Sequence, residues 1–341
     1  MTERTDGATI RDVAEKAGVS KSLVSLVLRG DPHVSDERRR AVYRAMADLG
    51  YRPNHAARAL SSSRSGIVGV LLNDLRNPWF AELLDGLTTT LHAAGLTPVL
   101  SESVTVRRAG GDAVQSLTGL GVDGLVVVGA TPDAAALTEA SALFPVVLAG
   151  ARQPRLPGGD VAVDDDLTGA RMATEHLIGL GHRRIAHLRG PGEEGALRLQ
   201  GYRRAMLAAG LDPDRYAEAG GMSEDSGYAS TRRLLTREDA PTAIFAFNDI
   251  SAVGALSAAA DAGINVPDGL SLVGYDDTYL ARIRHISLSS VDNGNYAVGV
   301  QAGRLLIARL DDPSRDARVV EVATTLHVRG STAPPRRAPL P

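Results

Sequence analysis

The sequence predicts an N-terminal all-α headpiece followed by a larger α/β core of two lobes. Three observations lead to this fold class. The segment from Thr9 to Gly50 contains short helical patterns separated by a glycine turn, whereas β-branched runs alternate with amphipathic helical patterns from Gly66 onward. Such alternation is typical of parallel sheets with helices on both faces. The chain has 341 residues, and the roughly 270 that follow the headpiece are too many for one such sheet, so two lobes are expected.

The first two helices of the headpiece form a helix-turn-helix pattern. Thr9 is the expected N-cap of a helix that runs to Ala17, and Gly18 supplies the tight turn. Ser20 caps a second helix over residues 21–28, which turns three polar side chains outward: Lys21, Ser22 and Ser25. This arrangement presents a recognition helix to the major groove of DNA.

A third helix and a hinge segment complete the N-terminal part. The helix is expected to follow the cap Ser35, to run to Leu49 and to end at Gly50. Segment 53–60 begins with Pro-Asn, which favours a helix start, but isolated helices below about 12–15 residues are marginal in water. Residues 61–65 form a serine-rich linker. The alternative interpretation of 53–65 is a frayed linker throughout.

Charge separates the two parts of the chain. Between Thr9 and Arg64 there are 11 lysine and arginine residues against 6 aspartate and glutamate residues, a net charge of +5. The rest of the chain holds 26 basic and 34 acidic residues, a net charge of −8. A basic headpiece on an acidic core indicates that the headpiece meets a polyanion. A three-helix scaffold that binds no DNA would leave this excess unexplained.

Composition and motifs argue against several other classes of protein. The chain contains no cysteine, which excludes disulfides and thiolate chemistry and fits a reducing cytoplasm. No signal peptide or membrane-length apolar run is recognised, so a cytoplasmic protein is expected rather than a secreted solute-binding protein. No nucleophile elbow, His-x-x-x-His spacing or phosphate-binding loop is found. We therefore expect no enzyme, no catalytic residues, no metal and no cofactor.

The core is expected to contain at least seven strands and five long helices. The predicted strands are 67–72, 97–101, 124–128, 146–149, 184–188, 243–247 and 270–274. The predicted helices between them are 78–94, 167–180, 198–209, 250–262 and 296–310. Ligands bind at the carboxyl ends of strands in open parallel sheets, so a site is expected in the cleft between the lobes.

Several motifs in this order resemble the LacI/GalR family of transcriptional regulators. In the headpiece they are Thr9-Ile-Arg-Asp-Val-Ala-Glu-Lys-Ala-Gly-Val-Ser, Gly50-Tyr-Arg-Pro-Asn and Ala57-Arg-Ala-Leu. In the core they include Asn77-Pro-Trp-Phe, Arg198-Leu-Gln-Gly-Tyr, Phe247-Asn-Asp and Leu272-Val-Gly-Tyr-Asp. The resemblance extends from Thr9 to about Ser331.

The resemblance implies a periplasmic-binding-protein-like core of two Rossmann-like lobes, with the chain crossing between them three times. The implied parts are a helix-turn-helix headpiece at 9–52, a hinge helix and linker at 53–65, and an effector-binding and dimerisation core at 66–331. Lobe one would comprise about 66–162 and 293–322, and lobe two about 163–292 and 323–331. The proline- and arginine-rich tail, 332–341, is expected to be disordered.

The resemblance also implies a set of DNA-contacting residues. In the recognition helix and its flanks they are Ser20, Lys21, Ser22, Leu23, Ser25, Leu26 and Arg29. In the hinge they are Asn54, Ala57, Arg58 and Leu60, of which Leu60 would wedge a base step in the minor groove beside its dimer mate. Leu26 stands where the family often has Arg or His, and an aliphatic side chain cannot donate to guanine. The operator is therefore expected to differ from the commonest family sequence.

The implied effector-binding residues lie in the loops after the strands: Asp74, Trp79, Phe80, Arg198, Met222, Asn248 and Asp276. Plainer interpretations stay open. Phe80 could belong to the core, Arg198 could serve only as an ion-pair partner, and Asn248 or Asp249 could cap the following helix. Residues 164–166 are expected to form a helix N-cap cluster rather than a metal site.

Hydroxyl-matching groups outnumber aromatic surfaces in this set, so a sugar or polyol effector is favoured over a purine or nucleoside. The expected partners are double-stranded operator DNA, the effector and a second copy of the chain in a homodimer, with no membrane.

Overall fold

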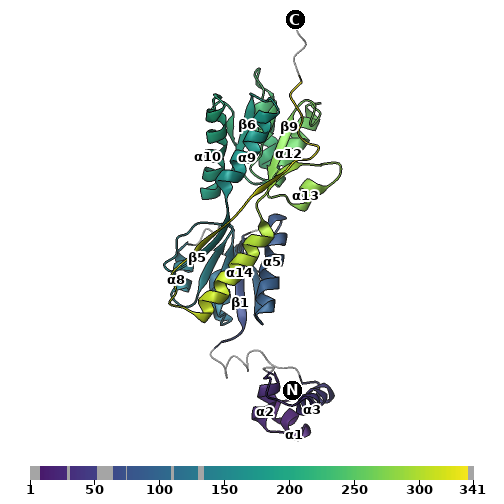
Figure 1. The fold of residues 1–341 in the computed structure, drawn as a ribbon, viewed down its shortest axis with the longest axis vertical. Helices are drawn as coiled ribbons and strands as arrows, with labels where there is room; N and C mark the ends of the chain where they lie inside the picture. The colour runs from purple at the N-terminus through teal and green to yellow at the C-terminus, as the bar shows by residue number, and fades with distance from the viewer. Residues whose placement is uncertain are drawn as a thin grey trace. The chain divides into compact units, whose positions relative to one another are not determined.

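The computed structural model describes residues 8–28, 31–51, 64–73, 75–108, 111–129 and 134–336. The chain divides into two units, Met1–Ser65 and Gly66–Pro341. The first holds the headpiece and the second holds the two-lobed core (Figure 1).

Three helices form the headpiece: α1 Ile10–Lys16, α2 Lys21–Leu28 and α3 Asp36–Leu49. Thr9 caps α1 in a reciprocal capping box with Asp12, and the left-handed Gly18 and Gly50 follow α1 and α3. Ser35 occupies the N-cap position of α3, although its side chain makes no capping hydrogen bond. The helices bury a small aliphatic core that includes Val13, Val24, Val27, Val42 and Ala45.

Lobe one is built on a six-stranded parallel sheet with the order β11-β5-β4-β3-β1-β2. Its strands are β1 Ile67–Leu72, β2 Thr97–Glu102, β3 Gly124–Val128, β4 Val146–Ala149, β5 Asp160–Asp164 and β11 Val319–Val322. Helices α5 (Trp79–Ala93) and α14 (Asn295–Asp311) cover one face, and α7 (Ala113–Gly119) and α8 (Ala134–Ser141) cover the other. The short helix α6 (Ser103–Arg108) follows β2.

Close packing of α5 on α14 depends on glycine. A Cβ at Gly86 would lie 2.1 Å from the carbonyl oxygen of Tyr296, and a Cβ at Gly299 would lie 2.0 Å from that of Leu83. A side chain at either position would therefore force the two helices apart.

Lobe two is built on a second six-stranded sheet with the order β12-β10-β9-β8-β6-β7. Its strands are β6 Ile185–Arg189, β7 Ala217–Ala219, β8 Ala243–Phe245, β9 Ser271–Tyr275, β10 Ser289–Asp292 and β12 Thr325–His327, and β12 alone pairs antiparallel. Helices α9 (Asp166–Gly179) and α10 (Gly192–Ala208) pack on one face. Helices α11 (Glu224–Leu235) and α12 (Asp249–Asp261) pack on the other, with the short α13 (Tyr279–Arg282) beside them.

Three segments connect the lobes, between β5 and α9, between β10 and α14, and between β11 and β12 (Figure 1). Each segment leaves its sheet at the carboxyl end of a strand, which is β5, β10 or β11. The cleft between the lobes is therefore bounded by strand ends from both sheets.

Two predicted features of lobe two need correction. Helix α10 begins at Gly192, six residues before the predicted start at Arg198. Glu193 and Glu194 fall in its first turn, where the helix dipole favours negative charge. Predicted strand 243–247 ends at Phe245, because the chain there turns into the cap of α12.

The first half of the tail is also ordered, contrary to expectation. His176 Nε2 lies 3.0 Å from Thr332 Oγ1, His182 Nε2 lies 2.9 Å from the carbonyl oxygen of Ala333, and Ser271 Oγ contacts the same carbonyl at 3.0 Å. These contacts hold residues 332–336 against lobe two, and residues 337–341 lie outside the described ranges.

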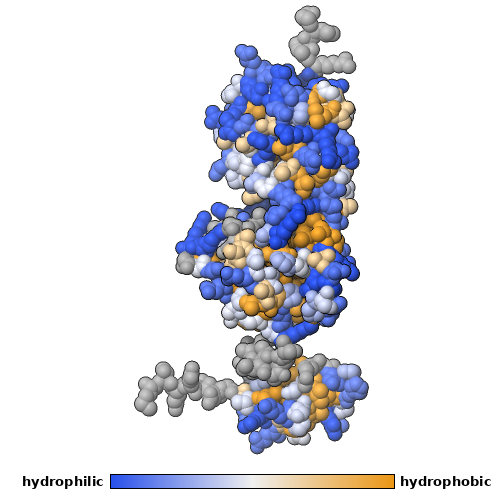
Figure 2. Space-filling view, turned by 90° about the vertical axis from the view of Figure 1, so that its left-hand side faces the viewer, coloured by the Kyte–Doolittle hydropathy of each residue, from blue (hydrophilic) through white to orange (hydrophobic). Residues whose placement is uncertain are grey.

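Among the described residues, no helix combines the length and the apolar character needed to span a membrane. Figure 2 shows one face on which hydrophilic residues dominate both lobes of the core and apolar patches are smaller.

Candidate functional site

The recognition helix α2 exposes its first turn. Ser20 Oγ accepts a hydrogen bond from the backbone N–H of Leu23 at 3.1 Å, so the helix starts with a capped N-terminus. Lys21 and Ser22 are exposed in that turn. A helix N-terminus with outward N–H groups and a lysine attracts phosphate and base acceptors. This end of α2 therefore has the chemistry of a DNA-contacting surface.

The other predicted headpiece residues are either half-buried or lie outside the described part of the chain. Leu23 and Leu26 are half-buried and pack against the headpiece core, and Ser25 is also half-buried. The aliphatic side chain of Leu26 therefore has a packing role as well as an exposed part. The remaining predicted DNA contacts lie outside the described residues: Arg29, Asn54, Ala57, Arg58 and Leu60.

A cavity of about 540 Å³ lies between the two lobes of the core. Lobe one contributes Trp79, Phe80 and Gly150, and lobe two contributes the ends of α10, α11 and α12. Six of the predicted effector residues line this cavity: Trp79, Phe80, Arg198, Met222, Asn248 and Asp276. The seventh, Asp74, lies outside the described residues.

Arg198 is buried, and its guanidinium is held on nearly every side. Nε donates to Asp166 Oδ1 at 2.9 Å, and Nη1 donates to the carbonyl oxygen of Phe247 at 2.7 Å. The rings of Tyr275 and Phe247 lie 3.7 and 4.5 Å from the guanidinium carbon. Nη2 lies 3.9 Å from Asp276 Oδ1. Arg198 is therefore an ion-pair partner that also lines the cavity.

Two carboxyl groups line the cavity near this arginine. Asp164 accepts a hydrogen bond from the hydroxyl of Tyr275 at 2.8 Å. Burial, with the neighbouring charge of Asp166, raises the pKa of Asp164 from 3.8 to about 7. Burial also raises the pKa of Asp276 well above its usual range, although the charge of Arg198 opposes this shift. Burial therefore favours the protonated form of both carboxyls despite the neighbouring charge of Arg198.

Asn248 caps a helix and also fixes the wall of the cavity. Its Oδ1 accepts from the backbone N–H of Ser251 at 2.9 Å, as the N-cap of α12. Its Nδ2 donates to the carbonyl oxygen of Met222 at 3.2 Å. The capping interpretation is thus correct, and a ligand that contacts Asn248 must share these groups.

The aromatic wall comes from lobe one. The rings of Trp79 and Phe80 meet edge to face, with centroids 4.9 Å apart. Phe80 is 6% exposed and belongs to the core of lobe one, so it both fills the core and lines the cavity. Gly150 has a positive φ of 69°, and a Cβ there would lie 2.4 Å from the indole of Trp79. The indole therefore packs directly on the backbone of Gly150.

Sequence reasoning missed several residues at the cavity. Phe247 lines it from lobe two, and Asn293 lines it from the crossing between β10 and α14. The acidic residues Glu194, Glu224 and Asp225 stand at the N-termini of α10 and α11. A helix N-cap signal could have placed Glu224 and Asp225, because Ser223 caps α11 in a capping box. No pattern in the linear sequence singles out Asn293 within its lobe crossing.

Residues 164–166 divide their roles. Asp165 caps α9 by accepting from the N–H of Thr168 at 2.9 Å, as the cap interpretation predicted. Asp166 is fully buried between Arg198 and Arg152, whose Nη1 lies 3.2 Å from Asp166 Oδ2. Because Arg152 follows β4 of lobe one, this carboxylate joins the cavity arginine to the opposite lobe.

The loop that carries Arg152 makes two more contacts with the first turn of α10. The backbone N–H of Arg152 donates to Glu194 Oε1 at 3.3 Å, and Gln153 Nε2 donates to Glu193 Oε2 at 2.8 Å. A ligand that moves α10 would therefore strain or break these hydrogen bonds between the lobes.

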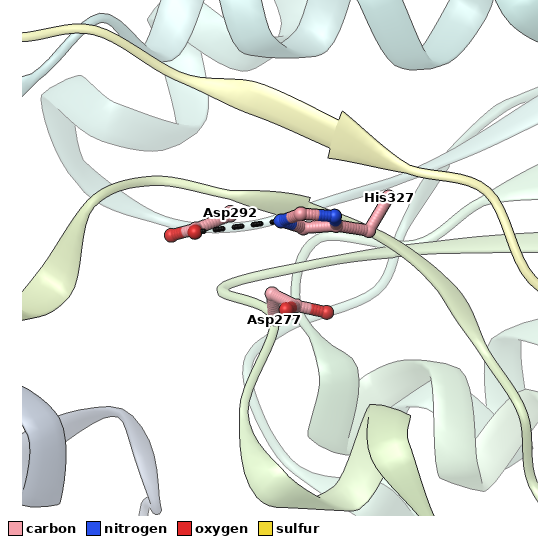
Figure 3. A group of neighbouring side chains, drawn as sticks. All are labelled: Asp277, Asp292 and His327. Atoms are coloured by element: carbon pink, nitrogen blue, oxygen red, sulfur yellow. Dashed lines mark ion pairs between the residues drawn. The ribbon is translucent and has the colours of Figure 1, made fainter.

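A group of Asp277, Asp292 and His327 near the lobe crossings has the residue types of a metal site (Figure 3). Their ligand atoms lie within 4.8 Å of one another, and Asp292 Oδ2 is 3.6 Å from His327 Nε2. Both oxygens of Asp277, however, accept from the guanidinium of Arg329. Two remaining groups are fewer than a bound metal ion needs, so this cluster fits a structural tie better than a metal site.

The sequence matches two families of known domains. Residues 9–54 match the lacI family of bacterial regulatory proteins, and residues 174–332 match a periplasmic binding protein-like domain. Catabolite control protein A of Priestia megaterium is 33% identical over 95% of this chain and 99% of its own length. The transcriptional regulator CelR of Thermobifida fusca is 34% identical over 96% of this chain and 99% of its own length. The transcriptional repressor PurR of Pectobacterium carotovorum is 32% identical, covering 96% and 97%.

Solved structures agree with these matches. The lac repressor dimer bound to operator and the anti-inducer ONPF superposes with a TM-score of 0.81 at 28% identity, covering 96% of this chain and 100% of that chain. The CelR–cellobiose complex gives a TM-score of 0.70 at 32% identity, covering 95% and 99%. With its helix-turn-helix headpiece and its ligand-binding core of periplasmic-binding-protein-like fold, the chain belongs to the lacI family of bacterial regulatory proteins and is a DNA-binding transcriptional regulator rather than an enzyme.

Proposed function

We propose that this regulator is a cytoplasmic repressor whose affinity for its operator is set by a sugar or sugar-like polyol bound between the lobes. The observation that carries the proposal is the placement of Arg198. One edge of its guanidinium is directed toward Asp276 at the cavity, while both faces and the other edge are held by protein groups. A rigid planar donor beside carboxylate acceptors matches neighbouring hydroxyl groups.

The opposite wall supports the same ligand class. A pyranose has an apolar C–H face as well as hydroxyls, and Trp79 offers a half-buried indole on the lobe-one side of the cavity. A cavity of about 540 Å³ also has the volume expected of a small-molecule site. CelR, a structural neighbour of this chain, was solved with cellobiose, which is one saccharide precedent.

A purine or nucleoside is the second candidate, because aromatic residues line the cavity from both lobes. On the lobe-two side, however, the ring of Phe247 is occupied. Arg198 lies 4.5 Å from its centroid, and a Cβ at Gly190 would come within 2.3 Å of the ring. Little of Phe247 is left for stacking on a base, so the sugar is favoured.

The proposed DNA contacts are those of α2 and the hinge. Lys21, Ser22 and the exposed part of Leu26 would meet base edges, while Ser20, Leu23, Ser25 and Arg29 would lie near phosphates. In the hinge, Asn54, Ala57 and Arg58 would flank Leu60, which would wedge the central step of a near-palindromic operator. Effector binding would change operator affinity through different affinities for two arrangements of the lobes.

We also propose a homodimer, which a palindromic operator requires. Both lobes expose apolar side chains: Leu75 precedes α5 in lobe one, and Tyr279 lies on α13 in lobe two. Arg282 of α13 lies 3.2 Å from Glu82 of α5, so these helices of the two lobes are neighbours. The lac repressor, a structural neighbour of this chain, was solved as a dimer on its operator.

The proposal is tested by fluorescence anisotropy of labelled DNA from upstream of the chain's own gene. The full chain is titrated with and without a panel of neutral saccharides, purine bases and nucleosides. A saccharide that changes operator affinity supports the assignment. A response to purines alone would replace the sugar by the second candidate.

A further inference from the structure

We propose that the effector is a saccharide without phosphate or carboxylate groups, and that the cavity rejects sugar phosphates, sugar acids and nucleotides. This inference rests on the proposed effector site and adds the charge of its ligand. The carboxylates at the cavity, and the hydrogen-bond acceptors that it leaves for a ligand, carry the argument.

Acidic side chains outnumber basic ones around the cavity. Among the described residues, five carboxylate side chains line it: Asp164, Glu194, Glu224, Asp225 and Asp276. The basic residues that line it are Arg76 and Arg198. Arg198 is already paired with the fully buried Asp166, so its charge is largely compensated before any ligand arrives. Because the pKa values of Asp164 and Asp276 are raised, the negative charge at the cavity lies mainly on Glu194, Glu224 and Asp225. These three acids outnumber Arg76, so a bound anion would meet a field that is negative on balance.

The hydrogen-bonding groups also favour a ligand that donates hydrogen bonds. Asn293 lines the cavity at 1% exposure, and its Nδ2 donates to Asp276 Oδ1 at 3.2 Å. Its Oδ1 has no partner among the described residues. A buried acceptor without a partner is costly, and a hydroxyl or amine of a ligand would satisfy it. A phosphate oxygen cannot, because it is an acceptor itself.

Two side chains that could donate to an anion already have protein partners. The amide nitrogen of Asn248 is engaged by the carbonyl oxygen of Met222. Nε and Nη1 of Arg198 are engaged by Asp166 and Phe247, which leaves the Nη2 edge toward the cavity. A neutral sugar fits this inventory, because each of its hydroxyls both donates and accepts.

The raised pKa values of Asp164 and Asp276 are consistent with this inventory. Burial is the main cause at both, and neighbouring carboxylates add to it. A phosphate would add up to two further negative charges beside them. Hydroxyl donors would instead stabilise the carboxylates.

The test compares matched saccharides on the full-length chain. Glucose, glucosamine and glucose 6-phosphate form one set, and neutral disaccharides with their 6-phosphates form others. Binding is followed by the fluorescence of Trp79 and by thermal shift. Within each set that binds, the neutral saccharide should bind at least about 100-fold more tightly than its phosphate.

Variants of the acidic residues at the start of α11 test whether these acids cause the selectivity against phosphate. The double variant Glu224→Gln/Asp225→Asn should lower the neutral-over-phosphate ratio by about tenfold. Glu175→Gln, an exposed acid that pairs with Arg171 on α9, should leave the ratio unchanged. Both variants keep Arg198, Asp164 and Asp276 intact.

The failures are distinguishable. A sugar phosphate that binds as tightly as its neutral partner would overturn the charge inference and leave the sugar assignment standing. An unaltered neutral-over-phosphate ratio in the Glu224→Gln/Asp225→Asn variant would overturn the role of these two acidic residues. Binding of purines with no response to any saccharide would overturn the proposed function itself.

Discussion

Replacing Arg198 should separate the stability of the core from its response to ligand. Arg198→Met keeps much of the aliphatic stem but removes the guanidinium that bonds Asp166 and the carbonyl oxygen of Phe247. Removing one partner of a buried ion pair typically costs 3–5 kcal/mol, because the other charge stays buried. Asp166 retains Arg152 at 3.2 Å, so the expected loss of unfolding free energy is near the lower end, about 3 kcal/mol.

A double-mutant cycle with Asp166→Asn tests the pair itself. Asp166→Asn removes the charge that Arg198→Met would strand, so the double variant should lose less unfolding free energy than the sum of the two single variants. The expected coupling is about 2 kcal/mol, within the range for residues in direct contact. Urea unfolding of the full chain and its variants gives these values.

The ligand readout differs from the stability readout. Losing a charged hydrogen bond to a ligand is worth about 1.5–3 kcal/mol, or roughly 10- to 150-fold in Kd. Arg198→Met should lose this affinity in the double variant too, even where stability recovers, while operator binding without ligand stays normal. Additive unfolding energies, or a ligand affinity unchanged in Arg198→Met, would refute the reasoning.

Three further predictions concern DNA and pH. Lys21→Ala should change which operator sequences a selection recovers, and an unchanged consensus would remove Lys21 from the base contacts. Leu60→Ala should lose operator bending and several kcal/mol of specific affinity, measured by gel mobility and anisotropy; normal bending would exclude the wedge. Asp164 has its pKa raised from 3.8 to about 7 in the folded chain, so its stabilising contribution is complete below pH 3.8 and is lost as pH rises through about 7. The fall in melting temperature from pH 5.5 to 8 should therefore be smaller in Asp164→Asn, and an equal fall would contradict the shift. The charged and titratable groups that face this carboxyl are Asp166, Arg198, Tyr275 and Asp276.

Three central strands of lobe one were predictable from sequence, whereas the last three strands of the chain were not. Strands 67–72, 124–128 and 146–149 were predicted with the observed bounds, because central parallel strands are buried on both faces and read as continuous apolar runs. The strands β11 and β12 are half-exposed, and β10 has the polar sequence Ser-Ser-Val-Asp. Their pairing is set by neighbouring strands, which short sequence windows do not contain.

The cavity shows the same division. The polar and aromatic residues in loops after strands were found, because strand ends meet at one edge of a parallel sheet. The buried link from Arg198 through Asp166 to Arg152 was not predicted, since it joins two lobes through residues 46 positions apart at its ends. Asn293 reaches the cavity from a lobe crossing, where no periodic pattern marks its direction.

The most direct test uses the single tryptophan of the chain as a reporter of the cavity. Trp79 lines the cavity, so its fluorescence should change when a ligand binds there. One sample of the full chain with labelled operator DNA is titrated with a saccharide that raises the melting temperature, while Trp79 fluorescence and DNA anisotropy are recorded together. If ligand in the interlobe cavity controls operator binding, both signals should change over one concentration range, and Arg198→Met should shift both equally. A change in operator affinity without any change at Trp79, or a saturated Trp79 signal with unchanged operator affinity, would contradict the account.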